Sequence, residues 1–316
     1  MSLSRPTPGG QRPSPPPLTR APGSISARTC FIAAFCLVSF IFAVYSPSLQ
    51  FQFVLDDHRF TADPRIQESG HIWDYFANYV WAQFTGGPPS FYRPVFILWM
   101  RMNFMFSALS PWGWHLLSIA KHVSVAVLLG LLVWRLLRDS LAALVASTLF
   151  ALHPAQTESV AWVTVPDPLM SAGVLGTLLL YLKYVGDFST AGQVAGRKSR
   201  KTSRIKAPRR SAEWLIVSAA VCFAALLAKE TAIIFPAVIL ALELFMARGR
   251  PAQTSGDANL GVHVVQAFRH VAPFVFVTVF YLLLRFHALG GKLGSDTQHL
   301  PWSTVILPGQ HVSGFT

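Results

Sequence analysis

The stretch TCFIAAFCLVSFIFAVY, residues 29–45, is a run of about 17 mostly apolar residues that directly follows Arg28. This length is near the lower limit for a helix that crosses the hydrocarbon core of a bilayer. No small-residue cleavage site clearly follows it, so we interpret the run as a membrane anchor rather than a removed signal peptide. The fold is therefore expected to be built around membrane-spanning helices.

The composition of the whole chain agrees with a membrane environment. Of the 316 residues, 52% are hydrophobic and 13% are charged, and the mean hydropathy is +0.44. An ordinary soluble domain carries about 25% charged residues. Apolar stretches recur along most of the chain, so one helical membrane domain is expected in place of two soluble ones.

The net charge of +12 is concentrated in tails and loops. Basic residues gather before the first apolar stretch, at Arg5, Arg12, Arg20 and Arg28, and in the run from Arg197 to Arg210. Cytoplasmic segments of membrane proteins carry such an excess of Lys and Arg, so no nucleic-acid partner is inferred. Residues 1–27, rich in Pro, Ser, Gly and Arg, are expected to form a disordered basic cytoplasmic tail.

The cysteines show no framework for a disulfide or a zinc site. Cys30, Cys36 and Cys222 all fall within apolar stretches and have no ligand-type spacing. We interpret them as packing residues.

Further apolar segments predict additional spanning helices. They lie at roughly 114–137, 140–152, 167–185, 213–228, 231–247 and 266–286. The segment 95–109 is also apolar, but it is short and carries Arg101 at its centre, a costly position for a spanning helix. We expect it to lie in the membrane interface, within the first external loop.

The positions of the Lys and Arg residues test this membrane topology. With a cytoplasmic amino terminus and seven spans, the basic loop 196–211 and the residues Arg135, Arg138 and Arg248 all fall inside. An eighth span at 95–109 would put the eight Lys and Arg of the run 197–210 outside, so seven spans are favoured. Residues 28–287 would then form the transmembrane domain. Residues 288–316 would begin a further external loop that is cut short.

Asp56 and Asp57 stand in FVLDDHRF, on the external side of this topology. Adjacent carboxylates repel each other, so the pair favours a cation, a basic partner or a raised pKa on one member. One carboxylate could act as a general base while the other orients a group or binds a divalent ion. The alternative is a solvated pair that caps a helix.

Arg93 belongs to a YRP motif, residues 92–94, directly before the interfacial segment. Its guanidinium fork suits a phosphate. The alternative is an arginine that extends toward lipid headgroups beside aromatic residues.

The segment HPAQTESVAWVTVPD, residues 153–167, interrupts two apolar stretches with His153, Glu158 and an Asp. Non-helical polar backbone at membrane depth is tolerated chiefly where it lines a cavity, so His153 and Glu158 are candidate substrate-binding residues. The alternative for both is a helix end with capping contacts.

Lys229 and Glu230 lie between two apolar helices in LLAKETAIIF, where charges near the membrane are functional candidates. Lys229 is a candidate for a phosphate contact. The alternative is a structural pair in which the two residues bond to each other.

Several of these stretches resemble, in order, the transmembrane and tetratricopeptide-repeat-containing family of O-mannosyltransferases, and more distantly other GT-C glycosyltransferases. The resemblance covers most of residues 40–295. It rests on FVLDDHRF, FYRPV with RMNFMFSAL, WGWHLLSIAKHVSVAVL, LFALHPAQTESVAWVTVPDPLMSA, LLAKETAIIFPAV and VFYLLLRFHALGG. His115 and His122 match family positions within a predicted span.

The resemblance implies an all-α GT-C fold, a polyprenyl- or dolichyl-phosphate mannose donor, and a hydroxyl acceptor on a protein or glycan. It places the catalytic base on Asp56 or Asp57 and implies an inverting mechanism at the external or lumenal face. Arg93, His153, Glu158, Lys229 and Glu230 would bind the donor phosphate or substrate. No cofactor is required if cations hold the phosphate, with a divalent cation at Asp56 and Asp57 as the alternative.

Two departures from the family keep other functions open. The chain ends at Thr316 within an expected external loop, and no repeat of about 34 residues is present. A truncated inactive relative, or a transporter or scaffold without enzymatic activity, is the alternative. The missing retention signal and the Arg-rich tail favour a bacterial inner membrane over the endoplasmic reticulum.

Overall fold

The computed structural model describes residues 27–82, 90–198, 212–248 and 259–291. Every regular element in these ranges is helical, which confirms the expected all-α membrane fold. The predicted tail 1–27, apart from Ala27, and most of the loop 196–211 and the segment 288–316 lie outside the described residues.

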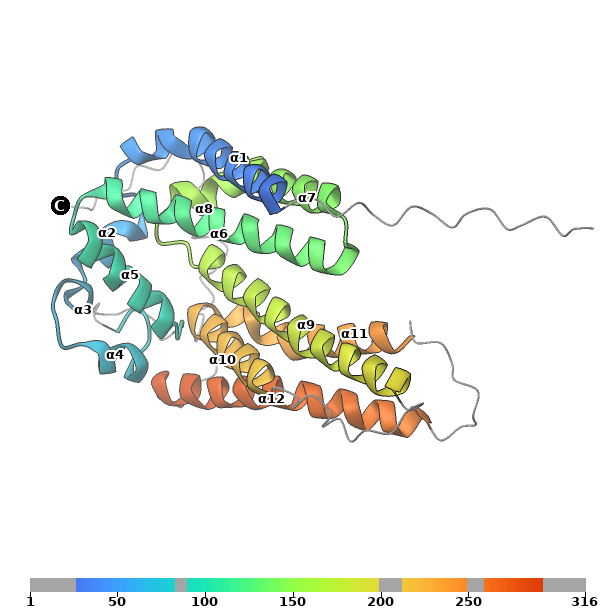
Figure 1. Ribbon diagram of the computed structural model, residues 1–316. Coiled ribbons are helices and arrows are strands. Elements are labelled where there is room, and N and C mark those ends of the chain that lie inside the picture. The colour runs from blue at the N-terminus through green and yellow to red at the C-terminus, as the bar shows by residue number, and fades with distance from the viewer. Residues whose placement is uncertain (1–26, 83–89, 199–211, 249–258, 292–316) are drawn as a thin grey trace, which may run out of the picture.

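One set of helices forms a bundle that extends between the two ends of the molecule (Figure 1). In chain order they are α1 (Ala27–Tyr45), α6 (Pro111–Leu137), α7 (Ser140–Leu152), α9 (Asp167–Lys198), α10 (Ala212–Ala228), α11 (Phe235–Arg248) and α12 (Asn259–Ala288). Successive members run in alternating directions, as the predicted threading requires (Figure 1).

Within the described ranges, four segments are long and apolar enough to cross a membrane. They are Phe31–Gln50, Pro111–Leu137, Asp167–Gly186 and Ala267–Ala288. Helices α7 and α10 are apolar but shorter, and α11 has 14 residues. The chain is an integral membrane protein, and the count of seven spans stays a prediction.

Shorter helices gather at one end of the bundle (Figure 1). They are η1 (Ser46–Gln50), α2 (Asp56–Ala62), α3 (Pro64–Gln67), α4 (Ile72–Ala77) and α5 (Pro94–Ser107). The 14 residues of α5 rise only about 21 Å, less than the roughly 30 Å of a hydrocarbon core. Arg101 of α5 donates to the carbonyl oxygens of Ile66 and Gln67 at 2.5 and 2.7 Å.

The segment between α7 and α9 differs from the expected non-helical chain. It contains η2 (Pro154–Gln156) and α8 (Thr157–Ala161), with extended backbone at His153 and Trp162 and a turn at Val163 and Thr164. The predicted helix 231–247 is likewise divided, into η3 (Glu230–Ile234) and α11. Pro236 lacks a backbone N–H and fits the first turn of a helix, so the α-helix begins anew beside it.

Local sequence explains the other boundaries. Pro111 stands at the start of α6, and the carboxylate of Asp139 caps α7 by accepting from the N–H groups of Leu141 and Ala142 at 2.8 and 3.3 Å. Three clusters of buried side chains hold the helices together. One joins α9, α10, α11 and α12, one joins the short helices to α6, and one joins α1, α6 and α7.

Helices α9 and α10 approach each other closely at Gly173. A Cβ atom added at Gly173 would lie 2.8 Å from Cβ of Ala225, whereas one at Gly176 would meet only Cγ1 of Val221 at 3.6 Å. The first distance is too short for two carbon atoms, and the second is an ordinary contact.

We expect Gly173→Ala to destabilise the protein by about 1–3 kcal/mol, because the two helices must move apart. Gly176→Ala is the matched control and is expected to be neutral or slightly stabilising, because alanine favours the helix. Thermal unfolding in detergent measures both. Equal midpoints for the two variants would contradict this packing.

Candidate functional site

A polar cavity of about 190 Å³ lies where the short helices meet the bundle. It brings together three residues that the sequence analysis selected, Asp56, Arg93 and Glu158, with Asp167 at the start of α9. Aromatic and apolar side chains complete its wall: Phe60, Val80, Trp81, Phe91, Phe96, Trp162, Val165 and Pro166. Carboxylates, a guanidinium and aromatic faces therefore share one hollow, although their positions span more than 100 residues of sequence.

A second cavity, of about 400 Å³, adjoins the first. Glu158, Val165 and Asp167 line both cavities. The second one extends toward the membrane helices, where His122, Val125, Phe150, Pro168 and Ser171 line it. Glu158 and Asp167 thus stand between a space under the short helices and a space among the long ones.

Asp56 and Asp57 have different surroundings although they are neighbours. Asp56 is half-buried and lines the smaller cavity, whereas Asp57 is buried at the start of α2. Oδ1 of Asp57 accepts from the hydroxyl and the N–H of Thr164 at 2.7 and 3.3 Å, and Oδ2 accepts from the N–H of Val54 at 3.1 Å. Asp56 therefore borders the cavity, and Asp57 connects two segments of the chain.

Burial raises the pKa of Asp57, and the hydrogen bonds from Thr164 and Val54 oppose this only in part. The net pKa is above the ordinary value of 3.8. This agrees with the expectation that one member of the pair has a raised pKa.

Lys121 also holds the segment that contains Thr164, the partner of Asp57. It is buried in α6, where Nζ donates to the carbonyl oxygens of Val163 and Val165 at 3.3 and 3.4 Å. These carbonyls flank Thr164, the partner of Asp57. The segment 163–165 is therefore held between a buried cation and a buried carboxylate.

Arg93 and Glu230 form a bidentate ion pair. Nε and Nη2 of Arg93 donate to the two carboxylate oxygens of Glu230 at 2.8 and 2.6 Å. Burial raises the pKa of Glu230, but the hydrogen bonds and charge of Arg93 outweigh this effect and hold the pKa below its ordinary value. The guanidinium also lies 4.1 Å from the ring centroid of Phe91. The pair joins the start of α5 to η3.

Lys229 pairs with Asp167, and Nζ lies 2.6 Å from both carboxylate oxygens. The suggested pair between Lys229 and Glu230 is therefore not what the structure shows. Lys229 has extended backbone, with φ −158° and ψ 133°, and successive side chains of extended chain point to opposite sides. The two neighbours consequently reach different partners.

His153 does not line either cavity. It is exposed, and its Nδ1 accepts from the N–H of Ala155 at 3.2 Å. This geometry is that of the helix cap, the alternative that the sequence had left open.

Sequence reasoning did not single out Lys121 or Thr164. A lysine in the middle of an apolar span is a signal that could have found Lys121, because such charges need a specific partner. No comparable signal marks Thr164, whose role depends on a contact 107 residues away.

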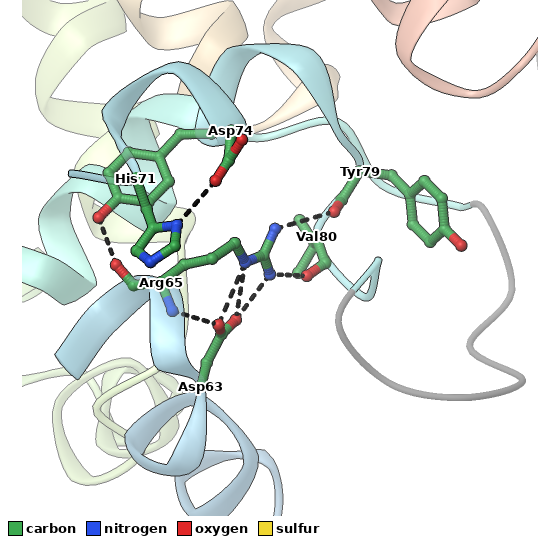
Figure 2. A network of polar contacts seen from close by, with 7 residues as sticks. Asp63, Arg65, His71, Asp74, Tyr79 and Val80 are labelled. Atoms are coloured by element: carbon green, nitrogen blue, oxygen red, sulfur yellow. Dashed lines mark hydrogen bonds and ion pairs between the residues drawn. The ribbon is translucent and has the colours of Figure 1, made fainter. Parts of the chain in front are cut away.

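A buried ion pair holds the wall of the cavity that carries Val80 and Trp81 (Figure 2). Nη2 of Arg65 lies 2.6 Å from Oδ2 of Asp63, and both side chains are almost completely buried. The guanidinium also donates to the carbonyl oxygens of Tyr79 and Val80 at 3.3 and 2.5 Å. These contacts fix the backbone beside the cavity.

We expect Arg65→Met to cost about 3–5 kcal/mol of stability, because it leaves the carboxylate of Asp63 buried without its cation. The double variant Asp63→Leu/Arg65→Met removes both charges and should be less destabilised than the single one. Unfolding curves of the three proteins measure this. A double variant at least as unstable as Arg65→Met alone would contradict the pairing.

The raised pKa of Asp57 predicts a pH dependence of stability. The folded protein binds this proton more tightly than the unfolded chain, so the stabilising contribution is complete below pH about 3.8 and is lost as pH rises through the folded pKa. Asp57→Asn should remove this slope. Unfolding midpoints of wild type and variant, each measured at about four pH values between 4 and 7, test this prediction. Parallel profiles of wild type and variant would show that Asp57 does not titrate in this way.

No group of three or more His, Cys, Asp or Glu side chains that could hold a metal ion occurs among the described residues. Both oxygens of Asp57 already accept hydrogen bonds.

The fold and this site define a polytopic helical membrane protein with a polar cavity at one end of its helix bundle. Comparison with curated proteins finds protein O-mannosyl-transferases. The chain is 26% identical to human TMTC3 over 271 residues, which is 81% of this chain and 27% of the relative. It is 29% identical to mouse TMTC3, over 67% of this chain and 21% of the relative, and 32% identical to Drosophila Tmtc2, over 64% and 20%.

The chain is thus a relative of the TMTC protein O-mannosyl-transferases, and the resemblance drawn from its sequence is confirmed. It spans only about a fifth to a quarter of these relatives' length. No family model and no solved structure matches it. The relatives named here come from human, mouse and Drosophila, so they give no support to the bacterial inner membrane that the sequence had favoured.

Proposed function

We propose that the chain is, or is part of, a membrane glycosyltransferase that moves mannose from a polyprenyl- or dolichyl-phosphate donor to a hydroxyl group, foremost a protein Ser or Thr. The observation that carries this proposal is the cavity that gathers Asp56, Arg93, Glu158 and Asp167 at one end of the bundle. The relatives are named as protein O-mannosyl-transferases, which supports the sugar and the protein acceptor.

Asp56 is the proposed general base, because it is the member of the acidic pair that lines the cavity. It removes the proton of the acceptor hydroxyl as that oxygen attacks the anomeric carbon. Asp57 is a positioning residue, because both of its oxygens hold backbone or hydroxyl donors. Its contact with Thr164 fixes α2, and therefore Asp56, against the wall formed by residues 164–167.

Attack from the face opposite the lipid phosphate inverts the anomeric carbon. The C–O bond to the phosphate breaks as the new C–O bond forms, and the leaving lipid phosphate takes the electron pair. Arg93 and Lys229 are the proposed cations for this developing charge. Each is now held by a carboxylate, at 2.6 Å in both cases, so the phosphate competes with Glu230 or Asp167.

The larger cavity supports the proposed route of the donor. It adjoins the smaller cavity at Glu158 and Asp167 and extends along α6 and α9, where the apolar side chains of Val125 and Pro168 lie beside the polar ones of His122 and Ser171. We assign Glu158 to binding of the sugar hydroxyls, because it lines both spaces. His153 keeps only the helix-end contact and takes no part in this scheme.

The proposed face is the lumenal one. The end with the cavity is opposite the end where α6 is followed by Arg138 and where α11 ends at Arg248 (Figure 1). The positive-inside rule places the basic end in the cytoplasm. Since the matched relatives are from animals, we propose the endoplasmic reticulum membrane over the bacterial inner membrane.

A transfer assay with purified protein, labelled polyprenyl-phosphate mannose and a Ser/Thr peptide tests the function. Asp56→Asn is expected to lower the transfer rate by about 10²–10⁴-fold with unchanged thermal unfolding, the usual loss for a general base. Asp57→Asn should lower the rate through a displaced wall and shift the unfolding midpoint as well. Asp139→Asn, a carboxylate at the opposite end of the bundle, is the matched control and should transfer as wild type does.

Equal transfer by wild type and Asp56→Asn would overturn the base assignment. Absence of transfer by wild type, under conditions in which a full-length relative transfers mannose, would overturn the enzymatic function of this chain and favour a scaffold or an inactive relative.

A further inference from the structure

A further hollow, separate from the two cavities of the candidate site, lies at the opposite end of the bundle. It is a groove of about 500 Å³ between the first half of α1, the last turns of α6 and the first turns of α7. Its walls include Ala33 and Ala34 on α1, Leu131 and Trp134 on α6, and Leu144 on α7. The groove is open on the outside of the bundle, since Leu131, Trp134 and Leu144 are all exposed.

Small side chains create the space. A Cβ atom added at Gly130 would lie 2.3 Å from Oγ of Ser147, so α6 and α7 meet at the floor of the groove. Ala33 and Ala34 leave room on the opposite wall. Volumes of about 300–1,000 Å³ are typical of ligand sites.

The mouth of the groove is cationic. Arg138 directly follows α6 and is exposed, and its guanidinium carbon lies 5.4 Å from the ring centroid of Trp134. Asp139 is the only carboxylate in α1, α6, α7 or the α6–α7 turn, and one of its oxygens caps α7. Arg135 faces the other way, toward the carbonyl oxygen of Leu182 on α9.

We propose that this groove binds an acyl chain of an anionic phospholipid whose negatively charged headgroup lies against Arg138. An apolar hollow open to the bilayer excludes water and favours a hydrocarbon chain. The arginine held on Trp134 supplies the charge that selects an anionic headgroup from a neutral one. The site is independent of the proposed transferase function, because it shares no residue with either cavity of the candidate site.

Native mass spectrometry of the full chain, delipidated in detergent, measures the selectivity. Dioleoyl phosphatidylserine and dioleoyl phosphatidylcholine are the probes, because their acyl chains are identical. One arginine beside an anionic headgroup corresponds to about a fivefold preference for phosphatidylserine. Equal retention of both lipids by wild type would overturn the proposal.

Arg138→Asn removes the charge and keeps the turn, because Arg138 has a φ of 56° and asparagine tolerates this left-handed conformation. We expect this variant to lose the preference while its unfolding midpoint stays near that of wild type. A preference that survives in Arg138→Asn would show that the anionic headgroup lies elsewhere.

Ala34→Phe fills the groove and should lower retention of both lipids. Ala224→Phe, on the exposed face of α10, adds the same ring outside the groove and should leave retention unchanged. Equal retention by the two variants would overturn the acyl-chain site.

Fluorescence quenching locates the chain separately. Phosphatidylserine with brominated chains should quench wild-type tryptophan fluorescence more than brominated phosphatidylcholine does, and Trp134→Phe should remove the difference. Persistence of the difference in Trp134→Phe would place the anionic lipid at another site.

Discussion

The hydrogen bonds between Asp57 and Thr164 are the constraint on which the candidate site depends. They join α2 to the segment before α9, and Lys121 holds the carbonyls on either side of Thr164. Three segments that are far apart in sequence are thereby joined at one short turn, in which the N–H of Val165 donates to the carbonyl oxygen of Trp162 at 3.3 Å. This contact helps to fix the separation of Asp56 and Asp167, since they stand on the two segments that it joins.

The connection is also electrostatic. A buried carboxylate or ammonium group is costly unless hydrogen bonds and an opposite charge compensate it. Here Lys121 and Asp57 each hydrogen-bond directly to the same stretch of backbone, residues 163–165. The wall of the cavity is therefore specified by two buried charges that could not easily be satisfied in another arrangement.

Much of the fold could be predicted because its signal is local. The apolar run 140–152 coincides with α7, and the runs at 114–137 and 213–228 come within three residues of α6 and α10. The interruption of the predicted helix at 231–247 was missed, although Pro236 marks it. Helix period and length cannot separate one helix from a 3₁₀ turn followed by a second helix.

The site could be predicted only in part. Charged residues are easy to find within apolar sequence, but the sequence does not show which distant residues they contact. Asp56, Arg93 and Glu158 were selected as charges beside the membrane, and they do line one cavity. The partner of Arg93 lies 137 residues away, and that of Lys229 lies 62 residues away. Adjacent Lys229 and Glu230 invite a local pair, yet extended backbone at Lys229 separates them.

These distant pairs bear on how an anion can bind. Arg93 contacts Glu230 through two hydrogen bonds, so a phosphate that reaches the guanidinium must replace them or share the remaining donors. Glu230 is tied to this exchange, because the low pKa of its carboxyl group depends on the same arginine. The two ion pairs therefore hold the cations in place without a ligand. In the proposed mechanism, the affinity for phosphate would be the difference between binding the incoming anion and releasing a carboxylate that is already well bound.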